Sequence, residues 1–319
     1  MFGAKGPYLE RHNLLLSANL RWVDSFRHFQ GSAEQFQRDT LGSNVENRQR
    51  VLDLSGLYQT SNQDSISLSV PILLRGAWGR KIPAPTANSP GGQQYNYEAS
   101  GLGDIAVTLR HWVLDIDRAK DGNYSIGIGV KAPTGDPHAE SAFPDSSGQN
   151  IINRPVDWSI QPGTGGWGIV FDVQAFKKLK GVTLFLSGTY LAEPKDVTGV
   201  ARNSTPSPTQ YFSAADQYLA RFGGLIPIKP VKGMTLSIGA RFEAVPVNDF
   251  IGADNGFRRP GHTLYIEPGL IWNRGRDTYS AYGPVAIERR RDPNAFGQKG
   301  DATFPDYILL FGYAHRFGK

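Results

Sequence analysis

The chain has 319 residues and no cysteine, which excludes disulfide scaffolds, zinc–thiolate sites and thiol catalysis. No run of roughly 18 apolar residues is present, so no membrane-spanning helix is expected, and a net charge of +5 without a long basic stretch argues against nucleic-acid binding. Its 37 glycines and 11% aromatic residues do not suit a disordered chain and favour an all-β protein.

Twelve segments alternate apolar with small or polar residues, which is the pattern of β-strands with two chemically different faces. The clearest example places Ile66, Leu68 and Val70 on one face and Ser67 and Ser69 on the other. Each segment has about ten residues or more, the length that crosses a bilayer with tilt, whereas globular strands usually have about five or six. In chain order, we expect strands at roughly 12–29, 47–59, 65–78, 102–114, 123–133, 167–177, 182–192, 215–228, 233–245, 262–273, 277–289 and 306–317.

The connections between these segments alternate strictly in length. Long polar loops occupy residues 30–46, 79–101, 134–166, 193–214, 246–261 and 290–305, and short turns occupy 60–64, 115–122, 178–181, 229–232 and 274–276. Long loops on one rim and short turns on the other are typical of outer-membrane barrels. The sequence therefore predicts an all-β fold with a single domain over residues 1–319. This is a closed antiparallel transmembrane β-barrel of about 12 strands, with long extracellular loops and short periplasmic turns, and both termini, including a segment at 1–11, in the periplasm.

Many aromatic residues lie on the apolar face of the alternating segments, mostly near the segment ends. Amphipathic rings at such positions form the two interfacial girdles of a membrane barrel. The residues predicted for these girdles are Trp22, Tyr58, Trp78, Tyr124, Trp167, Tyr190, Trp272, Tyr279 and Tyr313.

Pro71 is the one misfit within a predicted strand. Proline has no N–H and cannot donate to a ladder in mid-strand. We expect a β-bulge at Pro71, and a bulge would move the residues beyond it to the opposite face.

The N-terminus lacks the apolar segment of a secretory signal. Because a barrel of this kind must be exported, we expect the chain to be the mature form, secreted through a signal peptide that is not part of it. At the other end, Tyr313 and Phe317 alternate with smaller residues, similar to the terminal signal of bacterial barrels, although Gly318 and Lys319 follow the last aromatic. The expected localisation is the outer membrane of a Gram-negative-type bacterium.

Three glycine-containing motifs occur in order in the middle third of the chain, at Gly101-Leu-Gly-Asp104, Lys131-Ala-Pro-Thr-Gly135 and Gly163-Thr-Gly-Gly-Trp-Gly168. This order resembles the MetA-pathway phenol-degradation-like family of outer-membrane barrels. The resemblance implies a barrel that transports small organic compounds. The motifs also have a purely structural interpretation, because glycine-rich joints let strands turn at a rim and a proline ends a strand where a loop begins.

Strand alternation assigns charged side chains to the barrel lumen. The basic ones are Arg21, Arg27, Arg75, Arg110, Lys131, Arg221, Arg241 and Arg316, and the acidic ones are Asp53, Asp104, Asp172, Glu243 and Glu267. Eight bases against five acids leave a net charge of +3. Two interpretations are compatible: an ion-pair network that braces a narrow lumen, and a cationic pore that favours anions.

Other charges are expected outside the lumen. Arg48, Arg50 and Asp24 share the lipid-facing parity near the long loops, where a charge reaches headgroups at little cost. Together with Arg48 and Arg50, the clusters at 258–259 and 289–291 would face outward and bind lipopolysaccharide phosphates or a partner protein. A solvated loop with neighbouring acids is the alternative for these clusters.

No catalytic residue, metal site or cofactor is predicted, because the six histidines lie in no recognised metal or triad spacing. His111 has lipid-facing parity. An outer-membrane lipid hydrolase would require a serine hydroxyl within hydrogen-bond reach of His111.

The sequence as a whole predicts a channel or transporter for small solutes, including anionic or aromatic compounds. The alternative is a structural or partner-binding barrel with an occluded lumen, because twelve strands can enclose either a narrow pore or a filled core; a lipid hydrolase is third. The expected partners are outer-membrane lipid and lipopolysaccharide, a small-molecule solute and a protein bound through the long loops, but no nucleic acid.

Overall fold

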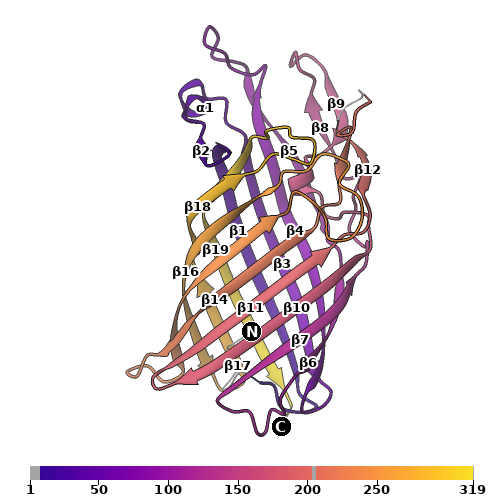
Figure 1. Cartoon of the computed structure of the whole chain (residues 1–319). Coiled ribbons are helices and arrows are strands. Elements are labelled where there is room, and N and C mark those ends of the chain that lie inside the picture. Colours follow the sequence, from indigo (N-terminus) through magenta and orange to yellow (C-terminus); the bar gives the residue numbers. More distant parts are fainter. Residues whose placement is uncertain (1–7, 203–205, 319) are drawn as a thin grey trace.

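The computed structural model describes residues 8–202 and 206–318, which form a closed barrel with loops gathered at one end (Figure 1). The wall strands are β1 (Leu14–Gln30), β3 (Glu46–Gln59), β4 (Asp64–Ile82), β5 (Gln93–Leu102), β6 (Ala106–Trp112), β7 (Gly122–Lys131), β10 (Gly168–Leu179), β11 (Val182–Ala192), β14 (Gln217–Pro227), β15 (Met234–Val245), β16 (Gly261–Arg274), β17 (Asp277–Tyr282), β18 (Val285–Arg291) and β19 (Ala302–Phe317). β5 and β6 pair with β4 one after the other and form one interrupted wall strand. β17 and β18 do the same beside β16, so the described residues build a wall of twelve strands.

The last strand closes the barrel onto the first. Leu14 of β1 lies opposite Tyr58 of β3 on one side and opposite Phe317 of β19 on the other, and every wall pairing is antiparallel. The start of β1 and the end of β19 therefore lie beside the turn at 60–63, at the end of the barrel that we call the short-turn rim. The opposite end is the long-loop rim. The predicted closed antiparallel barrel of about 12 strands is confirmed, and each predicted segment overlaps a wall strand.

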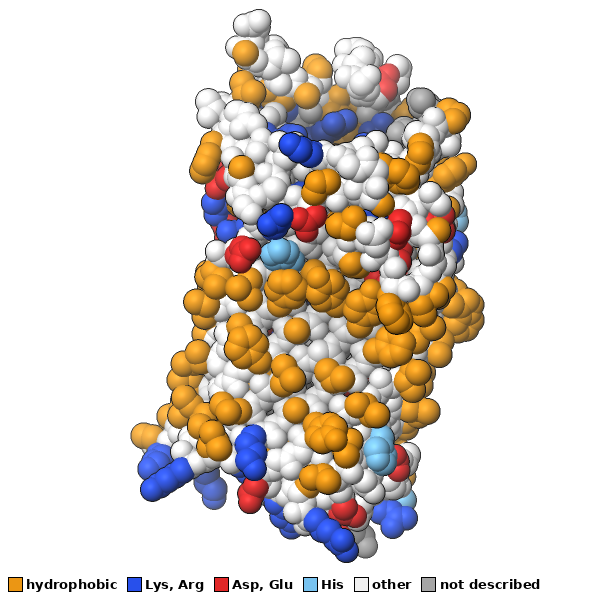
Figure 2. Space-filling view, viewed as in Figure 1, with side chains coloured by type: hydrophobic (Ala, Val, Ile, Leu, Met, Phe, Trp, Pro, Cys, Tyr) orange, Lys and Arg blue, Asp and Glu red, His pale blue; other side chains and the backbone are white. Residues whose placement is uncertain are grey.

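The outer surface of the wall is apolar over most of its height. Leu109, Ile126 and Phe222 are 58%, 57% and 60% exposed, whereas Thr108 and Ser125, which point inward, are buried. Figure 2 shows the resulting band of hydrophobic side chains around the middle of the molecule, between two rims that carry charge. A contiguous apolar surface of this extent is typical of a surface that meets lipid.

Aromatic side chains border this band on the outer face. Trp272, Tyr279 and Tyr313 form a continuous row, with ring centroids 5.8 and 5.4 Å apart. Of the residues predicted for the girdles, the structure places Trp22, Trp167 and Tyr190 towards the long-loop rim, and Tyr58, Tyr124, Trp272, Tyr279 and Tyr313 towards the short-turn rim.

The long connections contain short elements of their own. These are β2 (Ala33–Glu34), α1 (Phe36–Leu41), β8 (Glu140–Pro144), β9 (Ile151–Pro155), the 3-10 helix η1 (Trp158–Ile160), β12 (Val197–Ala201) and β13 (Tyr211–Ser213). Among the described residues, no helix has the length and apolar character needed to cross a membrane.

One predicted loop, 79–101, is largely strand. β4 continues to Ile82 and β5 begins at Gln93, so this hairpin projects beyond the barrel at the top of Figure 1. It is held by a small hydrophobic core in which Phe143 stacks on Tyr97 at 3.7 Å and Val156 is fully buried. The contact comes from a different loop, so local sequence could not reveal it.

The predicted bulge also lies elsewhere. Pro71 keeps a regular partner, Asp53, and its carbonyl accepts a hydrogen bond of 2.7 Å from Gly103 N, where the neighbouring wall strand is interrupted. The register instead shifts at Leu74, which has no partner between Leu73 and Arg75.

Two sequence predictions are wrong because of this bulge, which moves the side chains beyond it to the opposite face of the strand. Arg75, predicted in the lumen, lies opposite Arg50 on the outer face and pairs with exposed Glu98. Trp78, predicted in the outer girdle, turns inward and lines the interior of the barrel.

Candidate functional site

The described residues line two cavities in the barrel interior. The long-loop cavity, of about 1120 Å³, lies at the long-loop rim and is lined by the upper parts of the wall strands and by several loops. The short-turn cavity, of about 300 Å³, lies at the other end and is lined by the lower parts of the strands.

A chain of ion pairs lies between the two cavities. Arg221 lines the short-turn cavity, and Arg21, Arg241 and Glu243 line the long-loop cavity. Glu267 accepts a hydrogen bond from Arg221 Nε at 2.7 Å and lies 3.4 Å from Arg241 Nη1, while Glu243 accepts one from Arg241 Nε at 2.8 Å. Arg21 Nη2 reaches Glu243 Oε2 at 3.4 Å although β1 and β15 are not neighbouring strands, so this contact crosses the lumen. We call these five residues the ion-pair belt.

A second ion pair lies on the opposite part of the wall, where Arg110 Nε and Nη2 donate to Asp172 Oδ1 at 3.0 and 2.7 Å. The two side chains come from β6 and β10, and Gly127 of β7 lies between them in register. A Cβ atom at Gly127 would approach the Asp172 Cβ to 3.2 Å. Glycine at this position therefore provides the space through which the pair forms.

The first described residues pack inside the short-turn end. The ring of Tyr8 lies edge-on against Trp112 and Phe176, with centroids 5.0 and 5.3 Å away, and its hydroxyl donates to Ala119 O at 2.6 Å. Leu9 is buried against neighbouring strands. Both belong to the segment 1–11 that was predicted to be periplasmic. Residues 1–7 of that segment lie outside the described part of the chain, whereas Tyr8 and Leu9 lie inside the barrel and narrow it at this end.

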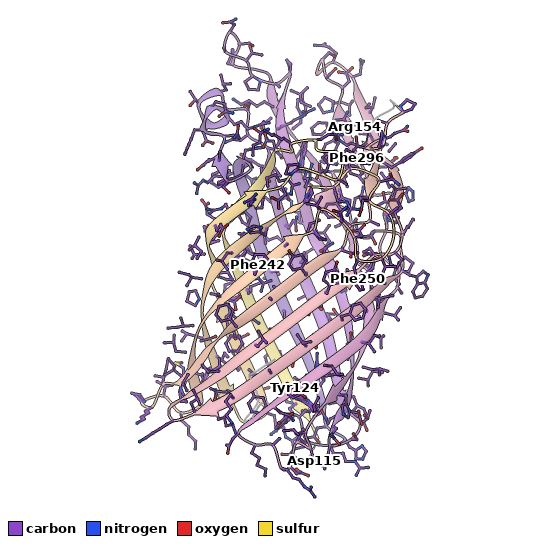
Figure 3. All side chains as sticks on the ribbon, viewed as in Figure 1. Asp115, Tyr124, Arg154, Phe242, Phe250 and Phe296 are labelled. Carbon is purple, nitrogen blue, oxygen red and sulfur yellow. The ribbon has the colours of Figure 1, made fainter. Side chains whose placement is uncertain are left out.

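The long-loop cavity is strongly basic. Its described lining contains eight arginines and three carboxylates, an excess of five positive charges. Figure 2 shows basic side chains in the hollow between the loops, and Figure 3 shows Arg154 among these loops, far from Tyr124 near the other rim. The arginines are Arg21, Arg38, Arg80, Arg154, Arg202, Arg241, Arg259 and Arg291, and the acids are Asp157, Glu243 and Asp301.

Most of these arginines were not among the predicted lumen residues. Arg80, Arg154 and Arg202 come from segments that the sequence indicates only as polar loops. Arg259, in the loop before β16, and Arg291, the last residue of β18, were expected to face outward, but both line the cavity. No local signal reveals this, because the direction of a loop depends on what it packs against.

The three sequence motifs meet in one buried polar cluster. Asp104 accepts from Lys131 Nζ at 2.7 Å, from Gly135 N at 2.9 Å and from Thr164 N at 3.0 Å. Lys131 also lies 2.8 Å from Glu193, which is fully buried and was not predicted as a site residue. Burial raises the pKa of Glu193 to about 7, because two carboxylates share one ammonium in a desolvated site. The motifs thus close the joint between β5 and β6.

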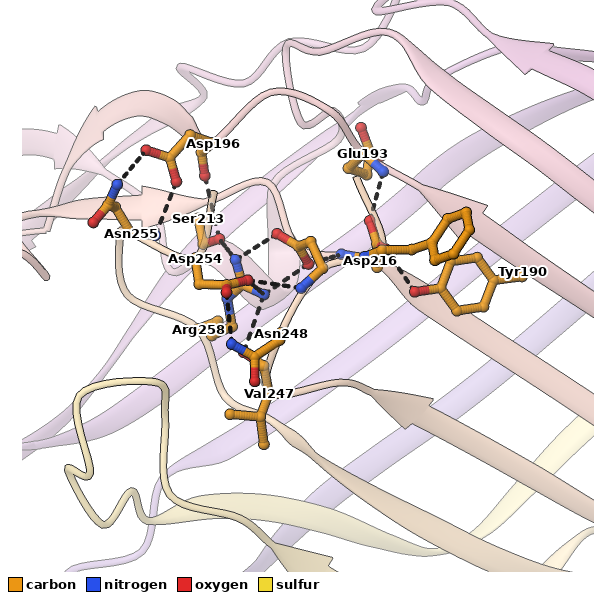
Figure 4. A network of polar contacts seen from close by, with 12 residues as sticks. Tyr190, Glu193, Asp196, Ser213, Asp216, Val247, Asn248, Asp254, Asn255 and Arg258 are labelled. Atoms are coloured by element: carbon orange, nitrogen blue, oxygen red, sulfur yellow. Dashed lines mark hydrogen bonds and ion pairs between the residues drawn. The ribbon is translucent and has the colours of Figure 1, made fainter. Parts of the chain in front are cut away.

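Another buried network fixes the loops after β11 and β15 (Figure 4). Asp216 accepts from Tyr190 Oη at 2.6 Å and from Phe250 N at 2.7 Å. Arg258 forms a two-pronged pair with Asp249, with distances of 2.7 and 2.6 Å. Arg258, expected on the outside, is therefore buried and structural.

The remaining predicted lumen residues have separate positions. Asp53 accepts from Ser69 Oγ at 3.0 Å on the inner wall. Arg27 pairs with Glu34 and Asp306 near the long-loop rim and does not line either cavity. Arg316 lies opposite Leu15 near the short-turn rim.

The outward charges near the long loops have aromatic or acidic partners. Arg50 pairs with Asp24 at 2.8 Å, and its guanidinium lies 3.8 Å from the ring centroid of Trp22. Arg48 and Arg290 are exposed and lie beside Glu46 and Asp292. A phosphate-binding cluster at 258–259 and 289–291 is not formed, because Arg258, Arg259 and Arg291 point into the protein.

Among the described residues, no hydrogen bond joins His111 to a serine; the nearest serine contact is indirect, because Ser61 Oγ donates at 2.7 Å to the Asp64 carboxylate that His111 also contacts. Its Nδ1 lies 2.8 Å from Asp64 Oδ1. The direct serine–histidine hydrogen bond that the hydrolase hypothesis requires is therefore not formed among the described residues. The described residues contain no group of three or more His, Asp or Glu side chains that could hold a metal ion.

Comparison with known proteins gives a fold relationship. No family model and no curated protein sequence matches the chain. Among solved structures, an outer membrane channel from Pseudomonas putida F1 matches with a TM-score of 0.60 at 14% identity, covering 99% of this chain and 98% of the channel. The translocator domain of the autotransporter NalP from Neisseria meningitidis matches with a TM-score of 0.47 at 12% identity, covering 98% and 90%. At such identities the likeness to the channel concerns the fold.

Proposed function

We propose that this chain is an outer-membrane channel for small solutes. The observation that carries the proposal is the access of solvent to the side of the ion-pair belt formed by Arg21 and Glu243. Within the barrel interior, the side chains of Arg21 and Glu243 are 38% and 25% exposed. A filled core would bury these charges or replace them with apolar residues, because a desolvated ion pair gains little over good hydrophobic packing.

The apolar outer band with its aromatic borders supports the membrane location. A closed barrel also satisfies every backbone hydrogen-bonding group within the wall, as a lipid environment requires. The hydrophobic band in Figure 2 would otherwise face water. Charged rims above and below the band suit the two headgroup regions.

The charge distribution supports a preference for anions. The excess positive charge does not lie along the wall strands, as strand alternation predicted, but at the long-loop rim. Inside the wall, bases and acids nearly balance. The bases are Arg21, Arg110, Lys131, Arg221 and Arg241, and the acids are Asp53, Asp104, Asp172, Glu193, Glu243 and Glu267. The positive excess lies in the long-loop cavity, where it would attract anions before they reach the belt.

A structural barrel with an occluded lumen is the second candidate. Tyr8 and Leu9 favour it, because they fill part of the short-turn end. The two functions differ in one measurable property, which is the passage of ions.

Planar-bilayer recording separates them. The wild type and a Tyr8→Ala/Leu9→Ala variant are compared in symmetric salt and then across a salt gradient. We expect single-channel currents from both proteins, larger in the variant, and a reversal potential that indicates anion preference. Absence of current from both, where a known porin conducts, would favour the structural role; cation preference would contradict the charge argument.

A further inference from the structure

Four arginines of the long-loop cavity have no acidic partner. Among the described residues, Arg80, Arg154, Arg202 and Arg291 form no ion pair, whereas the other four arginines of the lining each have a carboxylate within 4.0 Å. Burial and then the nearby charge of Arg259 lower the pKa of Arg202. Because none of these four arginines has a carboxylate partner among the described residues, their positive charges are uncompensated within the cavity.

Arg291 shows most clearly that these arginines lack partners. It is 4% exposed, and its Nη1 donates to Pro260 O at 2.9 Å, but its Nε and Nη2 are buried and have no hydrogen-bond partner. The Nε atoms of Arg80 and Arg154 are likewise buried and unpaired. A buried donor left without an acceptor is unfavourable, and more so when its group is charged. An oxyanion in the cavity would compensate the positive charge of these guanidinium groups, which line it.

Aromatic rings accompany these arginines. The guanidinium of Arg154 lies 5.1 Å from the ring centroids of Tyr97 and Phe143, and that of Arg202 lies 4.0 Å from Phe257. Trp158 also lines the cavity. Stacking holds each guanidinium plane in place, and the rings add apolar surface beside the charged groups.

We propose that the long-loop cavity binds small organic anions that carry a carboxylate on an aromatic body. The carboxylate fits the guanidinium fork, which presents paired donors in one plane. The aromatic body fits the ring-lined wall. The proposal names the solute class of the channel proposed above and rests on that function for its biological role, but the binding site itself does not require conduction.

The test is isothermal titration calorimetry of the purified full chain in detergent micelles, with benzoate, acetate and inorganic phosphate as probes. We expect benzoate to bind more tightly than acetate or phosphate. Arg154→Gln and Arg202→Gln should each weaken benzoate binding about tenfold, the effect of losing one charge-assisted hydrogen bond. Arg48→Gln, an exposed arginine outside the cavity, is the matched control and should bind like the wild type.

Several results would overturn the proposal: no heat of binding with benzoate, phosphate binding more tightly than benzoate, or equal benzoate affinity in the wild type and both cavity variants. Heat-modifiable migration on gels verifies that each variant is a folded barrel. Benzoate binding without bilayer currents would support the site and refute the channel. Currents without benzoate binding would refute the site and leave the channel standing.

Discussion

Replacing Glu267 by glutamine tests whether the ion-pair belt stabilises the barrel. The Glu267 side chain is 1% exposed and contacts both Arg221 and Arg241. Removing one partner of a wholly buried ion pair costs about 3–5 kcal/mol, because the remaining charge is uncompensated. Here Arg241 keeps Glu243, and Arg221 remains 21% exposed to water. We therefore expect the free energy of unfolding to fall by about 2–3 kcal/mol, below the full cost of an isolated pair.

The assay is urea unfolding of the barrel in phospholipid vesicles, followed by tryptophan fluorescence. Glu98→Gln is the matched control, because Glu98 and Arg75 are 53% and 63% exposed on the outside and exposed pairs contribute about 0–1 kcal/mol. Equal unfolding midpoints for Glu267→Gln and Glu98→Gln would refute the stabilising role of the belt.

Three further predictions concern other parts of the interior. Gly127→Val should lower stability by about 1–3 kcal/mol, because its Cβ would lie 3.1 Å from Leu109 O and displace Asp172; unchanged urea midpoints would contradict this. Glu193 has a folded pKa of about 7 against an ordinary 4.5, so the folded state binds the extra proton and stability falls as pH rises between these values. Glu193→Gln should flatten that slope in unfolding curves recorded across this range, and a slope equal to that of the wild type would count against the assignment. Tyr8→Ala removes the ring contacts with Trp112 and Phe176 and should increase single-channel conductance, so an unchanged current would show that Tyr8 does not narrow the pathway.

The polar cluster around Asp104 shows how far motifs can be interpreted without a structure. The three glycine-containing motifs were recognisable along the chain, and their residues meet through Lys131 and Thr164. Glu193 completes the cluster from a segment that local sequence describes only as the start of a loop. Its role depends on a contact with a strand distant in sequence, and no periodic pattern records such a contact.

Strand positions and the sorting of long and short connections followed from the sequence alone, because alternation and turn composition are local properties. The faces of residues beyond Leu74 did not, because a bulge is set by pairing with the neighbouring strand, and it reversed Arg75 and Trp78. The pairing of Arg21 with Glu243 across the lumen, and the inward fold of the loops that carry Arg202 and Arg259, arise only when the barrel closes. Closure joins β1 to β19 and brings together side chains from distant parts of the chain, and this proximity, rather than residue type, determines where positive charge accumulates.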